Sequence, residues 1–234
     1  MLGVLVNMLT VLVGGTIGTL FKKGIPEKIT NALMVGIGLC VIYIGISGAF
    51  EGKNTLVLIL SIVFGAIAGT VIDIDALINR FAKWVETKFN KKDSKKVSIA
   101  EGLVTATLLF CVGSMTVVGS LNAGLKGDNE MLLTKAALDA VTSVVLASTL
   151  GVGVILSAGS VLVIQGGLVL LSGLLNGILS EAAINEMTCA GSVIIIAIGL
   201  NLTGISKFKV ANYIPAIFFA PLFNWIFSLL PFSI

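Results

Sequence analysis

The chain consists of apolar runs, each about as long as a membrane-spanning helix, separated by short segments that hold most of its charged side chains. A helix needs about 20 consecutive apolar residues to cross the hydrocarbon core of a bilayer. Charged residues occupy 12% of the 234 positions, well below the roughly 25% of a soluble domain. The sequence therefore predicts an all-α, polytopic membrane protein.

The apolar runs predict eight transmembrane helices. The charge-free stretch from 140 to 180 is too long for one helix and suits two, which we divide at the small residues 157–160. The predicted spans are 1–21, 29–50, 54–72, 102–125, 131–156, 158–180, 187–206 and 210–234. We expect a single transmembrane domain, 1–234, with a first unit (1–72), a cytoplasmic segment (73–96), two central spans (97–157) and a second unit (158–234).

The segment 73–96 is predicted to form an amphipathic helix, because its apolar residues recur every three or four positions. Trp84 and the surrounding lysines are typical of a helix at the inner headgroup boundary of a membrane. The same pattern also suits a solvated helix packed on the protein's own inner surface. Both interpretations stay open at the level of sequence.

Lysines and the single arginine gather in alternate loops, which predicts the orientation of the chain. Cytoplasmic loops of membrane proteins are enriched in these residues. Basic residues lie between spans one and two, three and four, and seven and eight, at Lys22, Lys23 and Lys28, at 80–96, and at Lys207 and Lys209. We therefore expect a bacterial inner-membrane protein with both termini outside.

Two glycine-rich stretches resemble each other when shifted by about 154 positions. The first is Ile29-Thr30-Asn31 with Gly36, Gly38 and Gly45 after it, and the second is Ala183-Ile184-Asn185 with Gly191 and Gly199 after it. A Gly-Gly pair precedes each stretch. If spans one to three match spans six to eight, the two units enter the membrane from opposite sides. Such an inverted repeat is typical of secondary transporters.

Asp139 is the strongest candidate for a functional residue, because its predicted position lies within the fifth span. An acid at that depth is costly and is generally retained for function. Lys135, Asp139, Thr142 and Ser143 are predicted to share one helical face, and Lys135 is long enough to extend toward the interface. We expect Asp139 to bind a cation or a proton. The residues proposed to line the site or path are Asp139, Ser114, Thr116, Asn122, Thr142, Lys135, Asn7 and Gln165.

The glycines, hydroxyls and amide between Gly113 and Gly124 suggest a broken or tightly packed fourth span that lines a cavity. Two explanations of Asp139 remain open. It serves as an ion or proton site, or it forms an internal ion pair with Lys135 that only fixes helix packing.

Several classes of function lack any sequence support. Histidine is absent, the cysteines lack metal-binding spacing, and no phosphate-binding loop, dinucleotide fingerprint or nucleophile elbow occurs. We therefore expect no enzymatic activity, no cofactor, no bound metal and no nucleic-acid partner. The expected partners are the lipid bilayer, an unidentified small solute or ion, and other copies of the chain in a homo-oligomer.

A set of residues along the whole chain resembles a known family. It includes Asn7 with Gly14-Gly15, Ile25-Pro26-Glu27, Lys135 with Leu138-Asp139, Gln165, and the run from Val210 to Ala216. In these residues the chain is similar to the bacterial YdfK/YqgA-like membrane proteins, a family catalogued as a domain of unknown function. The resemblance implies a multi-span helical fold and no particular activity. We expect a transporter or channel for a small solute or ion, coupled to a cation or a proton. The alternative is a structural or partner-binding membrane protein that does not transport.

Overall fold

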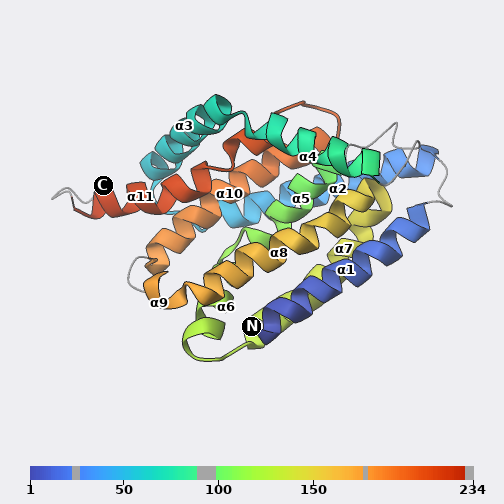
Figure 1. Ribbon diagram of the computed structural model, residues 1–234. Coiled ribbons are helices and arrows are strands. Elements are labelled where there is room, and N and C mark those ends of the chain that lie inside the picture. The colour runs from blue at the N-terminus through green and yellow to red at the C-terminus, as the bar shows by residue number, and fades with distance from the viewer. Residues whose placement is uncertain (23–26, 89–98, 176–178, 230–234) are drawn as a thin grey trace.

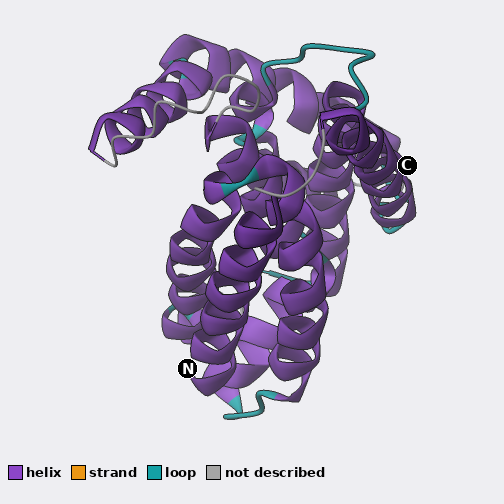
Figure 2. Ribbon diagram, turned by 90° about the vertical axis from the view of Figure 1, so that its right-hand side faces the viewer, coloured by secondary structure: helices purple, strands orange, loops and turns teal. Residues whose placement is uncertain are grey.

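The computed structural model describes residues 1–22, 27–88, 99–175 and 179–229, and within these ranges the chain forms helices and loops without any strand (Figure 2). The all-α prediction is confirmed. The elements are α1 (Leu2–Lys22), α2 (Glu27–Ala49), α3 (Thr55–Ile72), α4 (Ile74–Lys88), α5 (Ile99–Cys111), α6 (Ser114–Leu125), α7 (Glu130–Leu150), α8 (Val152–Leu170), α9 (Ser172–Leu175), α10 (Glu181–Leu202), the 3-10 helix η1 (Val210–Tyr213) and α11 (Ala216–Ser228).

The long helices are those expected of chain segments that cross a membrane. Seven segments are long and apolar enough to do so, and the pair α5 and α6, bent by 61° at a short break, brings the total to as many as eight. In hydrocarbon every backbone N–H and C=O must find a partner within the protein, which a helix provides along its own length. The chain is therefore a multi-pass helical membrane protein.

The boundary between the fifth and sixth spans was predicted wrongly. It lies at Gly151 instead of 157–160, which fall inside α8. Gly151 has a φ of 73°, and its N–H donates to the carbonyl of Ala147. Glycine adopts this conformation at little cost and can therefore end α7. Ser157 instead continues the helix and donates its hydroxyl to Val154.

The seventh span begins earlier than expected. We predicted a start at 187, whereas α10 begins at Glu181 after the N-cap Ser180, whose hydroxyl accepts from the N–H of Ala183. An acid in the first turn is favourable beside the positive end of the helix dipole. Glu186 therefore belongs to the helix and not to the preceding loop. The final helix, α11, ends at Ser228, and 230–234 lie outside the described residues.

Helices α1 and α7 lie side by side and run in the same direction (Figure 1). Gly3 faces Leu132 near the start of both helices, and Gly18 faces Ala147 near the end of both. For α1 and α7 to be parallel, the chain must pass from one end of the bundle to the other an odd number of times between them. Helices α2 and α3 account for two of these passages. The bent pair α5 and α6 together therefore makes the third.

Helices α2 and α10 form a close antiparallel pair whose contacts are reciprocal. A β-carbon added to Gly45 would lie 2.7 Å from Cγ1 of Ile196, and one added to Gly199 would lie 2.5 Å from Cγ1 of Ile42. Ile196 and Gly199 follow Ile42 and Gly45 by the same 154 positions. The same two residue types therefore meet twice, once on each side of the contact.

The bundle has a basic end and an opposite end. In Figure 1 the start of α1 and the end of α11 are the left-hand ends of their helices, with the start of α1 at the lower centre and the end of α11 at the far left. Helix α4 and the loop between α10 and η1, which carries Lys207 and Lys209, lie right of the centre, toward the opposite end of the bundle. Helix α4 covers the first part of the predicted amphipathic segment, and 89–98 lie outside the described residues.

Candidate functional site

Asp139 lies near the middle of α7 and is shielded from the protein surface. Its exposed fraction is 6%, the same as that of Lys135 one turn earlier. The ammonium Nζ of Lys135 lies 2.5 Å from Oδ2 of Asp139, forming an ion pair and a hydrogen bond. Lys135 does not extend toward the interface, contrary to our expectation, because the buried carboxylate holds its charged end.

Asn7 connects this ion pair to two other helices. Its side-chain Nδ2 donates to Oδ2 of Asp139 at 2.9 Å and to Oε1 of Gln165 at 3.2 Å. Asn7 belongs to α1 and Gln165 to α8, and both side chains are fully buried. The structure thus joins four of the eight proposed residues, Asn7, Lys135, Asp139 and Gln165, in one polar cluster that spans three helices.

The cluster keeps unused hydrogen-bonding capacity. Oδ1 of Asn7 and Nε2 of Gln165 are buried and have no hydrogen-bond partner among the described residues. Both bonds that Asp139 accepts within that part of the chain go to Oδ2, which leaves Oδ1 without one. A buried polar atom without a partner costs about 1–3 kcal/mol. A proton, water or small cation that fits between these atoms would recover part of that cost.

The break between α5 and α6 follows Cys111, the last residue of α5. Both helices contact α7, which carries Lys135 and Asp139. Gly113 then takes a φ of 138°, and no side chain caps the start of α6. The hydroxyl of Thr116 donates to the carbonyl of Phe110 across the break at 3.2 Å. The broken fourth span that the sequence suggested is therefore present.

The remaining proposed residues do not contact Asp139 in the described structure. Thr116 is engaged with Phe110, and Thr142 donates to the carbonyl of Leu138 on a partly exposed face of α7. The buried face of α7 instead carries Lys135, Asp139 and Ser143. Ser114 and Asn122 are partly exposed on α6. An oxygen shell from Ser114, Thr116 and Thr142 around Asp139 is thus not assembled.

Glu186 is a second buried acid, although the predicted spans, which end at 180 and resume at 187, leave it in the intervening loop. Its exposed fraction is 4%, and its Oε1 accepts from the N–H groups of Lys53 and Asn54 at 2.8 and 3.0 Å. These bonds fix the loop that leads into α3. Its Oε2 has no hydrogen-bond partner among the described residues. No sequence motif distinguishes Glu186 from a loop acid, because its partners are backbone atoms distant in sequence.

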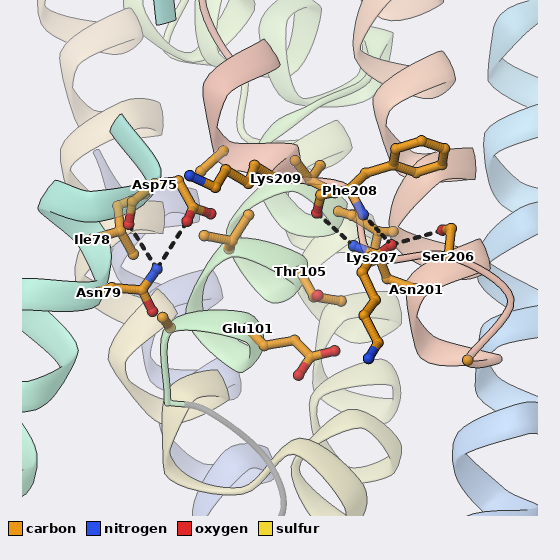
Figure 3. A pocket seen from close by; sticks show the side chains of 16 residues that line it. Asp75, Ile78, Asn79, Glu101, Thr105, Asn201, Ser206, Lys207, Phe208 and Lys209 are labelled. Carbon is orange, nitrogen blue, oxygen red and sulfur yellow. Dashed lines mark hydrogen bonds between the residues drawn. The ribbon is translucent and has the colours of Figure 1, made fainter. Parts of the chain in front are cut away.

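A separate pocket opens at the basic end of the bundle, with a volume of about 420 Å³ (Figure 3). Asp75, Glu101, Lys207 and Lys209 contribute charge to its walls. Asn201 shapes one wall, since its amide accepts from Ser206 and from the N–H of Phe208 and donates to the carbonyl of Phe208. Asp139 does not line this pocket. It also does not line the apolar groove between α1 and α7.

The described residues contain no group of three or more acidic or cysteine side chains placed to hold a metal ion.

Comparison with known proteins gives a family for the whole chain. The model of the family "Protein of unknown function (DUF554)" matches residues 2–225. The chain is 34% identical to "Uncharacterized membrane protein YdfK" of Bacillus subtilis (strain 168) over 225 residues, and 27% identical to "Uncharacterized protein YqgA" of Escherichia coli (strain K12) over 221 residues. Each alignment covers 94% of both chains. No solved structure matches the chain significantly. The chain belongs to the DUF554 family of membrane proteins, as its sequence resemblance indicated.

Proposed function

We propose that this protein is a membrane transporter or channel for a small solute or ion, coupled to a cation or proton that binds at Asp139. The observation that carries the proposal is the buried cluster of Asn7, Lys135, Asp139 and Gln165, in which polar atoms on three helices lack partners. Acids inside membrane proteins usually mark ion or proton paths. A purely structural cluster would be expected to satisfy all of its polar atoms.

The reciprocal contacts of α2 and α10 support an inverted repeat. Two units related by a twofold axis must repeat each contact across it, so that residue i meets residue j of the other unit and j meets i. The pairs Gly45 with Ile196 and Ile42 with Gly199 fulfil this condition. Transporters built from such units alternate access by moving one unit against the other around a central site.

The broken fourth span also supports transport. Broken helices inside a membrane are tolerated where protein or a water-filled cavity surrounds them. Here the break lies between Cys111 and Ser114, and the helices on both sides of it contact α7, which carries Asp139. The fully buried hydroxyl of Ser120 on α6 has no hydrogen-bond partner among the described residues. We infer a closed state, in which movement at this break would admit water or a cation to Asp139.

The proposed orientation follows the distribution of charge. Lys207, Lys209 and the basic residues of α4 lie at one end of the bundle. Assigning that end to the cytoplasm of a bacterial inner membrane places both termini outside. The polar cluster then lies in the outer half of the bundle, because Asn7 is close to the start of α1 and Gln165 is close to the end of α8.

The decisive experiment measures ion flux in liposomes that contain the purified protein. A sodium or pH gradient is imposed, and an internal pH dye together with radioactive sodium reports movement of either ion. We expect flux with the parent protein and with Asp128→Asn, which removes an exposed loop carboxylate. We expect Asp139→Asn to reduce flux to that of protein-free liposomes. Unchanged flux in the folded Asp139→Asn variant would disprove the site.

The ion pair between Lys135 and Asp139 supports a second candidate function, a non-transporting structural or partner-binding membrane protein. A neutralised pair inside the bundle can fix helix register without moving ions. This alternative predicts that liposomes containing the parent protein conduct neither sodium nor protons above the protein-free level. Flux that depends on Asp139 would exclude it.

A further inference from the structure

We propose that α4 is a membrane-surface helix that binds anionic lipid headgroups at the basic end of the bundle. Helix α4 begins directly after Asp73, whose left-handed conformation ends the spanning helix α3. Its described residues include Asp75, Arg80, Lys83, Glu86 and Lys88, and charged side chains at this density are not found in a segment that crosses hydrocarbon. The helix therefore starts at the surface of the membrane and cannot re-enter it as a span.

One side of α4 packs on the protein. Ala82 is buried against Ile99 and Ala100 of α5, and Ile78 packs on the same cluster. Asp75 faces the same side, where its carboxylate accepts from the side-chain amide of Asn79 at 3.0 Å. This side holds the helix against the end of the bundle.

A second side of α4 carries an exposed apolar stripe of Leu77, Phe81 and Trp84. Their exposed fractions are 50%, 46% and 57%, and their spacing of four and three residues aligns them along the helix. The rings of Phe81 and Trp84 stack with centroids 6.0 Å apart. Tryptophan is enriched at the headgroup level of membranes because its ring is both apolar and able to donate a hydrogen bond.

A third side of α4 is basic. Arg80 and Lys83 are exposed, and they lie between the apolar stripe and the packed side around the helix. The anionic inner leaflet attracts each such side chain with an energy equivalent to about a five-fold preference in binding. The sequence continues with Lys91, Lys92, Lys95 and Lys96, which lie outside the described residues. Apolar and basic flanks on one helix match the acyl and phosphate layers of a lipid surface.

The exposed surface next to α4 supports lipid as the occupant, rather than a second copy of the chain. Val71 and Ile72, at the end of α3, are 81% and 58% exposed and belong to a candidate membrane span. The apolar stripe on α4 begins only a few residues after this exposed end of α3. Lipid that surrounds the end of α3 can therefore also contact the stripe on α4, and no second protein is needed to cover it.

The test uses the fluorescence of single tryptophans, because the chain has only Trp84 and Trp225. Trp225→Phe leaves Trp84, and Trp84→Phe leaves Trp225, an exposed residue of the spanning helix α11 that serves as the matched control. Each protein is placed in vesicles that contain equal amounts of phosphatidylcholine and phosphatidylglycerol, with either one brominated. We expect both brominated lipids to quench Trp84, with at least two-fold stronger quenching by brominated phosphatidylglycerol. Trp225 should show no preference.

Adding Arg80→Gln and Lys83→Gln to the Trp225→Phe protein should abolish the preference of Trp84 while leaving it quenched by both lipids. Equal quenching of Trp84 by the two lipids in the Trp225→Phe protein would overturn the anionic-lipid site. Absence of Trp84 quenching by both brominated lipids would also overturn it. Quenching by aqueous iodide would then show that Trp84 faces water, and no quenching by iodide would show that protein, such as a second copy of the chain, covers it.

Discussion

Asn7 and Asp139, which are 132 positions apart in the sequence, are joined by a buried hydrogen bond of 2.9 Å that links α1 to α7. The parallel packing of these helices brings the first turns of α1 level with the first half of α7. The bond attaches the acid to a second helix, and through Asn7 to Gln165 on a third. The contribution of this hydrogen bond to stability can be measured as a change in the free energy of unfolding.

Replacing Asn7 with leucine should lower the free energy of unfolding by about 1–3 kcal/mol, because Asp139 loses a donor and the carbonyl of Gln165 loses its partner. Thr16→Val on the same helix is the control. Its hydroxyl bonds only to its own helix and is exposed, so a change within about 0.5 kcal/mol is expected. Equal effects of the two variants in equilibrium unfolding would contradict a role for Asn7 in the cluster.

Breaking the ion pair should be costly in either single variant and much less so in the double variant. Lys135→Met leaves a buried carboxylate and Asp139→Asn leaves a buried ammonium, each with an expected loss of about 3–5 kcal/mol. The double variant removes both charges. A double-mutant cycle on unfolding free energy measures the coupling, and additive losses would show that the two side chains do not interact.

Gly45→Ala should destabilise the contact of α2 with α10 by about 1–3 kcal/mol, because overpacking displaces well-packed neighbours. The added methyl group would lie 2.7 Å from Cγ1 of Ile196 and 2.8 Å from the carbonyl oxygen of Ser192. Gly36→Ala on the same helix meets no atom within 4 Å, and replacing a helical glycine there should raise stability by about 0.5–1 kcal/mol. Thermal unfolding of both variants checks the opposite signs.

The proposed twofold relationship between α2 and α10 predicts the same cost at an equivalent position. Gly199→Ala should cost about as much as Gly45→Ala, since its methyl group would meet Ile42 in the equivalent way. A negligible cost at Gly199 alone would count against equivalence of the two helices.

Gly113→Ala should strain the break in the fourth span although space is available. Gly113 has φ 138° and ψ 152°, a region that only glycine enters readily, and an added β-carbon would meet no atom within 4 Å. Strain of this kind costs about 1–3 kcal/mol. Gly159→Ala, inside α8 and equally unobstructed, is the control and should not destabilise. Unfolding curves that coincide for the two variants would remove the argument from backbone strain.

Labelling with a membrane-impermeant maleimide should establish the orientation. Asp128 and Lys207 are both exposed and lie at opposite ends of the bundle. With Cys40→Ser as background, Asp128→Cys should react in intact cells, whereas Lys207→Cys should react only after the membrane is opened. The reverse pattern would place both termini in the cytoplasm.

The membrane-spanning, all-helical architecture follows from the sequence alone, because apolar length and backbone hydrogen bonding in hydrocarbon leave few alternatives. It also singled out Asp139, Lys135, Asn7 and Gln165, since polar side chains are conspicuous inside apolar runs. The break between α7 and α8 depends on the backbone torsion of Gly151. The burial of Glu186 and the hydrogen bonds of Asn7 depend on contacts between segments that are distant in the sequence. These features are visible only in the folded protein, because the packing of the helices determines which buried polar atoms meet and leaves Thr142 on the outer face of α7.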